Sequence, residues 1–384
     1  MVWFSKPLIV GNAMLHAYMT LFMVSFMICG FLLLGKRHVL ARSGRGDDHK
    51  AVQAAHSRPT LRIGGIGVVA SMALALVVFA PEEVRPATTL FSVSLLPTFL
   101  AGLAEDLGWE VSPTLRLIWA FVSSCTVMAL CGWWITDTGL PGLDWALGFL
   151  PLALVWTAIW TSGVCHAFNL IDGVNGFAGT TAVAVALGLA GIAYQAGDPL
   201  MVQVALGLVP ALLGFLVFNF PLGRIFLGDA GAYTIGHILS WVGIVIALRS
   251  PEVAGVSVGL LFFWPVADTF LAMYRRRTKA MSTTRADRMH VHQIVMRGLE
   301  LGWFGERRRE LSNPLTTVIL LPLVVFPVVL GVLFWNAPLV SMALIVVLGI
   351  VFVWSYLKGV EKIRKTALRR RRLSIARGSA VAAE

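Results

Sequence analysis

The sequence predicts an all-α polytopic membrane protein with about eleven transmembrane helices. Of its 384 residues, 57% are hydrophobic and only 13% are charged, which is about half the charged share of a soluble domain. The apolar residues form long blocks, and a block of about 20 such residues crosses a bilayer as a helix. Both observations argue against a soluble domain and against a β-barrel, whose strands alternate and are about 10 residues long.

Eleven apolar segments follow one another along the chain. They lie at about 14–34, 64–80, 88–104, 116–131, 148–164, 177–194, 200–218, 231–248, 255–274, 315–334 and 338–357. The first is too long for a signal-peptide core and shows no small-residue cleavage site, so we expect a retained helix. Residues 1–357 are therefore interpreted as a single transmembrane domain, followed by a basic tail at 358–384.

Basic residues orient these segments. Of the 31 lysine and arginine residues, 28 fall in one set of alternate loops and the tail, and only Lys6, Arg85 and Arg249 fall on the other side. Basic residues in short loops stay cytoplasmic, so we expect the N-terminus outside and the C-terminus inside. The net charge of +11 then reflects topology, and the run 369–372 favours an anchor on anionic lipid over a nucleic-acid site.

The predicted cytoplasmic loops carry polar clusters. These loops lie at about 35–63, 105–116, 165–176, 219–230 and 275–313. Glu105 and Asp106 are adjacent carboxylates that repel, so one of them could serve as a base; a solvated loop end is the alternative. Asn169, Asp172 and Asn175 are spaced three apart, which predicts one helix face. Such a face could bind a metal or a sugar, and helix capping is the alternative.

Two further clusters complete the polar inventory. Asp229 lies at the start of segment 231–248, where a carboxylate can cap a helix or supply an oxygen ligand to Mg²⁺. His290 and His292 lie near Arg288, a pattern that favours phosphate binding or proton transfer. Carboxylates, amides, histidines and arginines on one membrane face suit Mg²⁺-dependent phosphoryl transfer, in which catalysis is mostly positioning and charge neutralisation.

Taken together, these motifs resemble a known family of membrane enzymes. The chain is similar over about 56–300 to the polyprenyl-phosphate N-acetylhexosamine-1-phosphate transferases, a superfamily that includes the phospho-N-acetylmuramoyl-pentapeptide transferase. The motifs that carry the resemblance are His56-Ser57-Arg58-Pro59-Thr60 with Gly64-Gly65, Glu105-Asp106, Asn169-Leu170-Ile171-Asp172-Gly173-Val174-Asn175-Gly176, Phe226-Leu227-Gly228-Asp229 and His290-Val291-His292. Their order and common side make the resemblance specific.

The resemblance implies a reaction and its partners. Undecaprenyl phosphate would attack the sugar-linked phosphate of a UDP-sugar, such as UDP-N-acetylglucosamine, and UMP would leave. The lipid-diphosphate sugar formed would start a cell-surface polysaccharide such as O-antigen lipopolysaccharide. The implied cofactor is Mg²⁺, with Mn²⁺ as a substitute. The implied location is a bacterial inner membrane, with the active site facing the cytoplasm and a homodimer as one assembly state.

The resemblance also implies roles for the acidic and amide residues. Asp229, together with Asn169, would hold the metal. Asp106, beside Glu105, would deprotonate or position the lipid phosphate. Asp172 would belong to the catalytic nucleotide-sugar site.

Further residues would bind substrate. Asn175 would contact the nucleotide sugar. His290 would act in catalysis and His292 would bind the diphosphate or the sugar. Arg58 and Arg288 would neutralise phosphate charge.

Some features separate the alternatives. The family usually has Asp-Asp where this chain has Glu105-Asp106, and Gln293 stands where the muramoyl-pentapeptide branch has a histidine. The latter favours the polysaccharide-initiating branch over the phospho-N-acetylmuramoyl-pentapeptide transferase. A membrane transporter is the alternative from another class, but no internal repeat is seen. Asp268 either pairs with a basic residue or lines the lipid-phosphate groove.

Overall fold

The computed structural model describes residues 12–36, 60–278, 289–305 and 308–381, with side chains up to 369. In this described part, nine helical stretches are long and apolar enough to cross a membrane. They are α1 (Asn12–Leu34), α4 with α5 (Arg85–Val93 and Leu95–Asp106), α6 (Pro113–Cys131), α8 (Leu150–Ile171), α9 (Phe177–Gln195), α10 (Pro199–Asn219), α11 (Gly228–Arg249), α15 (Arg309–Leu333) and α16 (Pro338–Val381). The predicted class of all-α polytopic membrane protein is therefore confirmed.

Two predicted segments are helical but irregular. Segment 64–80 forms α3 (Gly65–Leu74), which continues as a π-helical turn, η2 (Ala75–Phe79). Segment 255–274 forms α12 (Gly255–Leu261) and α13 (Phe263–Thr278), which meet at an angle of 78°. The described helices thus give nine spans, or ten if the bent pair is one span.

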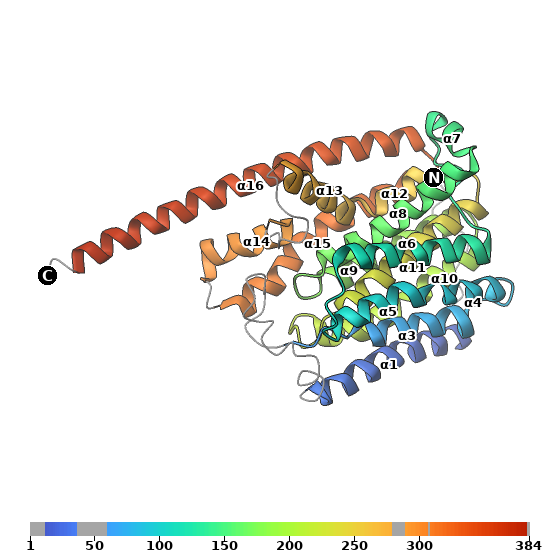
Figure 1. Ribbon diagram of the computed structural model, residues 1–384, viewed down its shortest axis with the longest axis horizontal. Coiled ribbons are helices and arrows are strands. Elements are labelled where there is room, and N and C mark those ends of the chain that lie inside the picture. Colours follow the sequence, from blue (N-terminus) through green and yellow to red (C-terminus); the bar gives the residue numbers. More distant parts are fainter. Residues whose placement is uncertain (1–11, 37–59, 279–288, 306–307, 382–384) are drawn as a thin grey trace.

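Three short helices connect or flank the spans. They are α7 (Pro141–Leu147), α14 (Val291–Leu299) and the π-helical turn η3 (Glu300–Phe304). The long α16 runs along the bundle and then extends beyond it (Figure 1).

Helix α11 forms the centre of the bundle, and nearly all of its side chains are buried by other helices. Small residues let α3 and α5 approach its first turn closely. A Cβ placed on Gly65 would lie 2.3 Å from Gly231 Cα, and one placed on Gly102 would lie 2.5 Å from Ala230 N. Close approach through small residues is how helices pack without a hydrophobic driving force in lipid. The start of α11 is therefore held by two neighbours.

A short backbone ladder aligns α3 with α11. The N–H of Phe226 donates to Leu61 O at 2.8 Å, and the N–H groups of Gly64 and Gly65 donate to Phe226 O and Leu227 O at 2.8 Å. These bonds pair the segment before α3 with the segment before α11. Both helices consequently begin side by side at one end of the bundle.

The other end of α11 is fixed by an ion pair. Asp198, the N-cap of α10, accepts from Arg249 Nε at 2.6 Å and from its Nη2 at 3.3 Å. Asp198 also caps its own helix through Met201 N. A buried carboxylate therefore lies at each end of α11. Asp198, contributed by α10, lies at its last residue, and Asp229 lies in its first turn.

Candidate active site

The first turn of α11 is capped by a carboxylate from α5. Asp106 is 3% exposed, and its Oδ1 and Oδ2 accept from the N–H groups of Asp229 and Ala230, each at 2.9 Å. Gly228 permits this turn because its φ is +70°, and a Cβ there would overlap Arg62 O. A carboxylate on exposed helix N–H groups is favoured by hydrogen bonding and by the helix dipole. Asp106 therefore fixes the direction of the Asp229 side chain.

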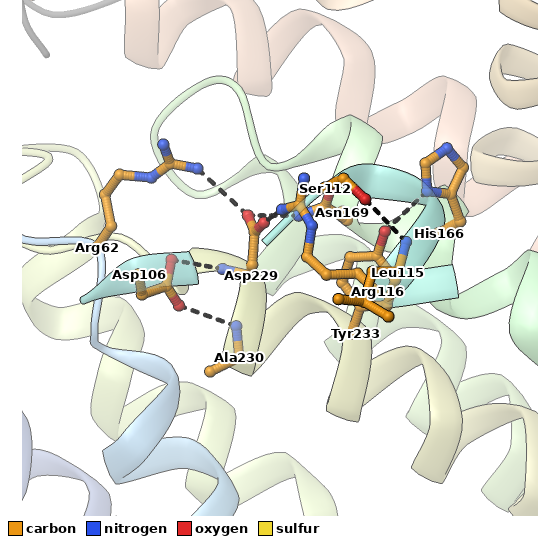
Figure 2. A network of polar contacts seen from close by, with 10 residues as sticks. All are labelled: Arg62, Asp106, Ser112, Leu115, Arg116, His166, Asn169, Asp229, Ala230 and Tyr233. Atoms are coloured by element: carbon orange, nitrogen blue, oxygen red, sulfur yellow. Dashed lines mark hydrogen bonds and ion pairs between the residues drawn. The ribbon is translucent and has the colours of Figure 1, made fainter. Parts of the chain in front are cut away.

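Asp229 collects three donors from separate elements (Figure 2). Asn169 Nδ2, near the end of α8, donates to Oδ1 at 2.8 Å, and Arg62 Nη2 lies 3.3 Å from the same oxygen. Arg116, in the first turn of α6, forms an ion pair with Oδ2. Asp229 is only 2% exposed. One buried carboxylate thus meets two guanidinium groups, which is an arrangement suited to handling anionic phosphate.

A tyrosine and a histidine extend this network. The Arg116 guanidinium lies 5.9 Å from the centre of the Tyr233 ring, and Tyr233 Oη lies 2.9 Å from His166 Nδ1. Neither Tyr233 nor His166 is a site residue in the sequence prediction, and Arg62 and Arg116 count there only as loop charges. In the sequence, Arg62 and Arg116 are marked as site candidates only by their place along the chain. Arg62 lies just before a predicted helix, and Arg116 lies at the start of one.

The expected polar helix face after segment 148–164 is wrong. Helix α8 ends at Ile171, and Asp172 leaves helical geometry with φ −79° and ψ 48°. Asn175 lies in the following turn, where its Nδ2 donates to Pro221 O at 2.7 Å and its N–H to Asn313 Oδ1 at 2.7 Å. Only Asn169 remains on the helix, so these residues do not share one face.

Asp172 lies beside the start of α11. Burial raises its pKa to about 7, while Arg62 and the backbone N–H of Gly228 oppose the shift. Loss of solvation disfavours the charged form, and a nearby cation or N–H donor favours it. The Asp172 carboxyl therefore changes charge near neutral pH, as a general base must.

The two histidines lie at the start of α14. His290 Nδ1 is 2.9 Å from Asp268 Oδ2, and Asp268 Oδ1 accepts from Val291 N at 3.3 Å. Asp268 therefore pairs with the His290 ring, which is charged only if protonated; the other role considered for Asp268, lining the lipid-phosphate groove, stays a prediction. The Gln293 side chain accepts from His290 N at 3.3 Å. These contacts fix the orientation of the His290 ring.

His292 packs against the turn that carries Asp172. A Cβ on Gly173 would lie 2.3 Å from His292 Nε2, so only glycine leaves room for the ring. Burial lowers the pKa of His292 to about 4, assisted by His290 and opposed by Asp268. His292 is therefore neutral at pH 7 and can both donate and accept a hydrogen bond.

The remaining predicted site residues are placed as follows. Glu105 is partly buried at the end of α5, next to Asp106. Arg58 and Arg288 lie outside the described residues. The described members from the ends of α5 and α8 and from the starts of α6, α11 and α14 gather at one end of the bundle, as the motif pattern predicts.

The side chains at and around Asp229 match a binding site for a divalent cation only in part. Within the described chain, no group of three or more His, Cys, Asp or Glu side chains is arranged to hold a metal. Asp229 Oδ2 is buried, and its partner in the described chain is the Arg116 guanidinium, through an ion pair. Mg²⁺ is commonly held by one or two carboxylates and completed by substrate phosphates and water. The site therefore fits such an ion with Asp229 as its protein ligand and Asn169 beside it.

Comparison with known proteins gives consistent matches. The chain is 26% identical over 261 residues to the probable undecaprenyl-phosphate N-acetylglucosaminyl 1-phosphate transferase of Bacillus subtilis (strain 168), a match covering 65% of this chain and 69% of that protein. It is 26% identical over 243 residues to the undecaprenyl-phosphate alpha-N-acetylglucosaminyl 1-phosphate transferase of Yersinia pestis, covering 61% and 65%. For the protein of that name in Escherichia coli (strain K12), identity is 30% over 154 residues, covering 39% and 40%. The chain thus spans about two thirds or less of the length of these relatives.

A family-level match covers the centre of the site. Residues 88–247 match glycosyl transferase family 4. This stretch includes Asp106, Arg116, Asn169, Asp172 and Asp229, which the structure brings to one end of the bundle. The part of the chain that carries most of the described site is therefore similar to glycosyl transferase family 4.

Proposed function

We propose that this protein transfers N-acetylhexosamine 1-phosphate from a UDP-sugar to undecaprenyl phosphate and releases UMP. The observation that carries the proposal is the buried Asp229 carboxylate between Arg62 and Arg116, in a chain whose relatives bear the name of this transferase. Those names favour N-acetylglucosamine as the sugar. Gln293 supports the same branch over the muramoyl-pentapeptide transferase.

In this proposal the arginines bind the diphosphate of the nucleotide sugar, and the carboxylates position the reacting groups. Arg62 and Arg116 neutralise the diphosphate of the nucleotide sugar. Asp229, with Asn169, would hold a Mg²⁺ ion, and that ion would supply further charge neutralisation. Asp106 orients Asp229 through the first turn of α11. His290 and His292 bind the diphosphate or the sugar.

The proton acceptor we favour is Asp172. Its pKa of about 7 lets it accept a proton from the monoanionic form of the lipid phosphate at neutral pH. Asp106 uses both carboxylate oxygens on backbone N–H groups, so a positioning role suits it better than a base role. Transfer then joins the lipid phosphate oxygen to the sugar-linked phosphorus, and the bond to the UMP oxygen breaks.

The proposed topology places the site at a membrane surface. Eleven crossings, with α3 and the bent α12–α13 pair included, put the N-terminus outside and the C-terminus in the cytoplasm. The supporting observation is that 28 of the 31 basic residues fall, along the sequence, in the tail and in the alternate loops that also carry the site motifs. This places the reaction where a soluble UDP-sugar meets a lipid phosphate, in a bacterial inner membrane. A pathway such as O-antigen synthesis and a homodimeric state are part of the same proposal.

A reconstituted assay tests the reaction. Purified protein with Mg²⁺ and undecaprenyl phosphate is given UDP-N-acetylglucosamine, UDP-N-acetylgalactosamine or UDP-N-acetylmuramoyl-pentapeptide in separate reactions. We expect UMP and a lipid-diphosphate sugar in equal amounts from an N-acetylhexosamine donor, and no UMP without the lipid phosphate. Lipid product from the pentapeptide donor alone would favour the alternative branch, and no lipid product from any donor would overturn the proposal.

Asp106→Asn tests the positioning role within this reaction. The asparagine amide keeps only one acceptor oxygen, so the backbone N–H of either Asp229 or Ala230 loses its hydrogen-bond acceptor. We expect turnover to fall about 10- to 100-fold and the thermal midpoint to drop, because an unpaired buried N–H costs about 1–3 kcal/mol. Asp144 of α7, whose Oδ1 accepts from Thr138 N at 2.7 Å at the other end of α6 and α8, provides the control: Asp144→Asn should change turnover little. Loss of turnover in Asp106→Asn with an unchanged midpoint would instead indicate direct contact with substrate.

A further inference from the structure

A cavity of about 420 Å³ lies between α1, η2, α4 and α10. It is at the end of the bundle away from Asp229, because α3 starts at the site and only η2, which follows the last turn of α3, lines the cavity. Its volume lies within the range of small-molecule sites. The cavity belongs neither to the network around Asp229 nor to the histidine cluster.

The walls of the cavity suit a hydrocarbon chain. Leu21, Leu76, Phe79 and Val204 are among the apolar residues that line it. The π-helical turn η2 contributes a large part of the lining. Single π-helical turns inside helices are rare and frequently occur at functional sites.

Polar groups also face this apolar space. Tyr18 and Gln203 both line the cavity, and the Tyr18 hydroxyl is buried with no hydrogen-bond partner in the described chain. An unsatisfied hydroxyl in an apolar setting costs on the order of 1–3 kcal/mol. A ligand with an acceptor oxygen at this depth would remove that cost for Tyr18, and the Gln203 amide offers a second donor.

A basic side chain lines the cavity, and an acidic side chain lies next to it. Arg85 lines the cavity and is anchored by Ala80 O, which accepts from its Nε at 3.1 Å and its Nη2 at 3.0 Å. Its Nη1 lies 3.8 Å from Glu82 Oε1, and Glu82 is 88% exposed. Such an exposed pair contributes little by itself. Arg85 can therefore bind a phosphate while Glu82 binds an ammonium group.

We propose that this cavity binds one zwitterionic glycerophospholipid with an ethanolamine headgroup. The phosphate lies at Arg85, the ammonium at Glu82, and the ester oxygens accept from Tyr18 and Gln203. One acyl chain fills the apolar part. Glu82 and Glu83 beside a single arginine disfavour a purely anionic headgroup, because their charges would repel it. The site is independent of the proposed transferase activity.

Native mass spectrometry of the delipidated full-length protein tests the site. Phosphatidylethanolamine and phosphatidylglycerol are titrated separately, and we expect one ethanolamine lipid to bind at least tenfold more tightly. Tyr18→Phe and Gln203→Leu should each weaken it about fivefold, the effect of one lost hydrogen bond. Thr126→Val is the matched control, because Thr126 bonds within its own helix, to Val122 O at 2.9 Å, and lies outside the cavity.

A cavity-filling variant provides an independent test. A Cβ on Gly207 would meet only Ala75 Cβ, at 3.9 Å, so Gly207→Leu can fold and fill the space. We expect it to abolish lipid binding with an unchanged thermal midpoint in detergent. Equal binding in Gly207→Leu and the unaltered protein would overturn the site. Equal affinity for both headgroups, or displacement by undecaprenyl phosphate at equimolar concentration, would overturn the proposed occupant.

Discussion

Asp229→Asn is expected to lower UMP formation on the order of 10³-fold. The substitution keeps the shape of the side chain and removes its charge. Arg62 and Arg116 then face a neutral amide, so two partly buried guanidinium groups lose their common counter-ion. A neutral amide is also a poor ligand for Mg²⁺, which prefers carboxylate oxygens. The steady-state rate over a Mg²⁺ titration measures the effect, and excess Mg²⁺ should not restore it.

Asp198→Asn is the matched control for this experiment. Asp198 is likewise a buried carboxylate, 7% exposed and paired with an arginine, Arg249 at 2.6 Å. It lies at the opposite end of α11, so its loss should reduce thermal stability and leave turnover per folded molecule nearly unchanged. If Asp229→Asn kept more than a tenth of the activity, the metal assignment of Asp229 would be wrong. If both variants lost activity equally, the defect would be one of folding.

Sequence patterns predicted the features that depend on segment length and chain order. Apolar blocks of bilayer length gave the helices, because lipid forces the backbone to satisfy its own hydrogen bonds. The ends of those blocks placed Asp106 at the end of α5 and Asp229 at the start of α11. Helices that pack side by side bring such ends together, so the gathering of the motifs at one end of the bundle was predictable.

Contacts set by long-range backbone pairing were not predictable. Arg62 reaches Asp229 because Leu61 pairs with Phe226, a contact between segments more than 160 residues apart. The spacing of Asn169, Asp172 and Asn175 suggested a helix face, but the helix ends at Ile171. The bend of 78° between α12 and α13 likewise has no counterpart in the apolar pattern, which continues through it.

Asp172 is expected to give the reaction an acidic limb in its pH profile. Burial raises the pKa of this carboxyl to about 7, so it is protonated at pH 5 and ionised at pH 8. Only the ionised form can accept a proton. The value of kcat/KM should therefore rise about tenfold per pH unit below pH 7 and level off above it. Asp172→Asn should lower the plateau by about 10²- to 10⁴-fold, the usual contribution of a general base.

The lipid phosphate itself titrates in a nearby range, because a phosphate monoester loses its second proton near pH 6. The two sources of an acidic limb differ in their response to substitution. Asp172→Asn removes a limb that belongs to Asp172 and leaves one that belongs to the substrate. Arg62→Met should shift the midpoint of the Asp172 limb to higher pH, since Arg62 lowers the pKa of Asp172. A limb that kept its midpoint in both variants would assign the proton to the lipid phosphate and exclude Asp172 as the base.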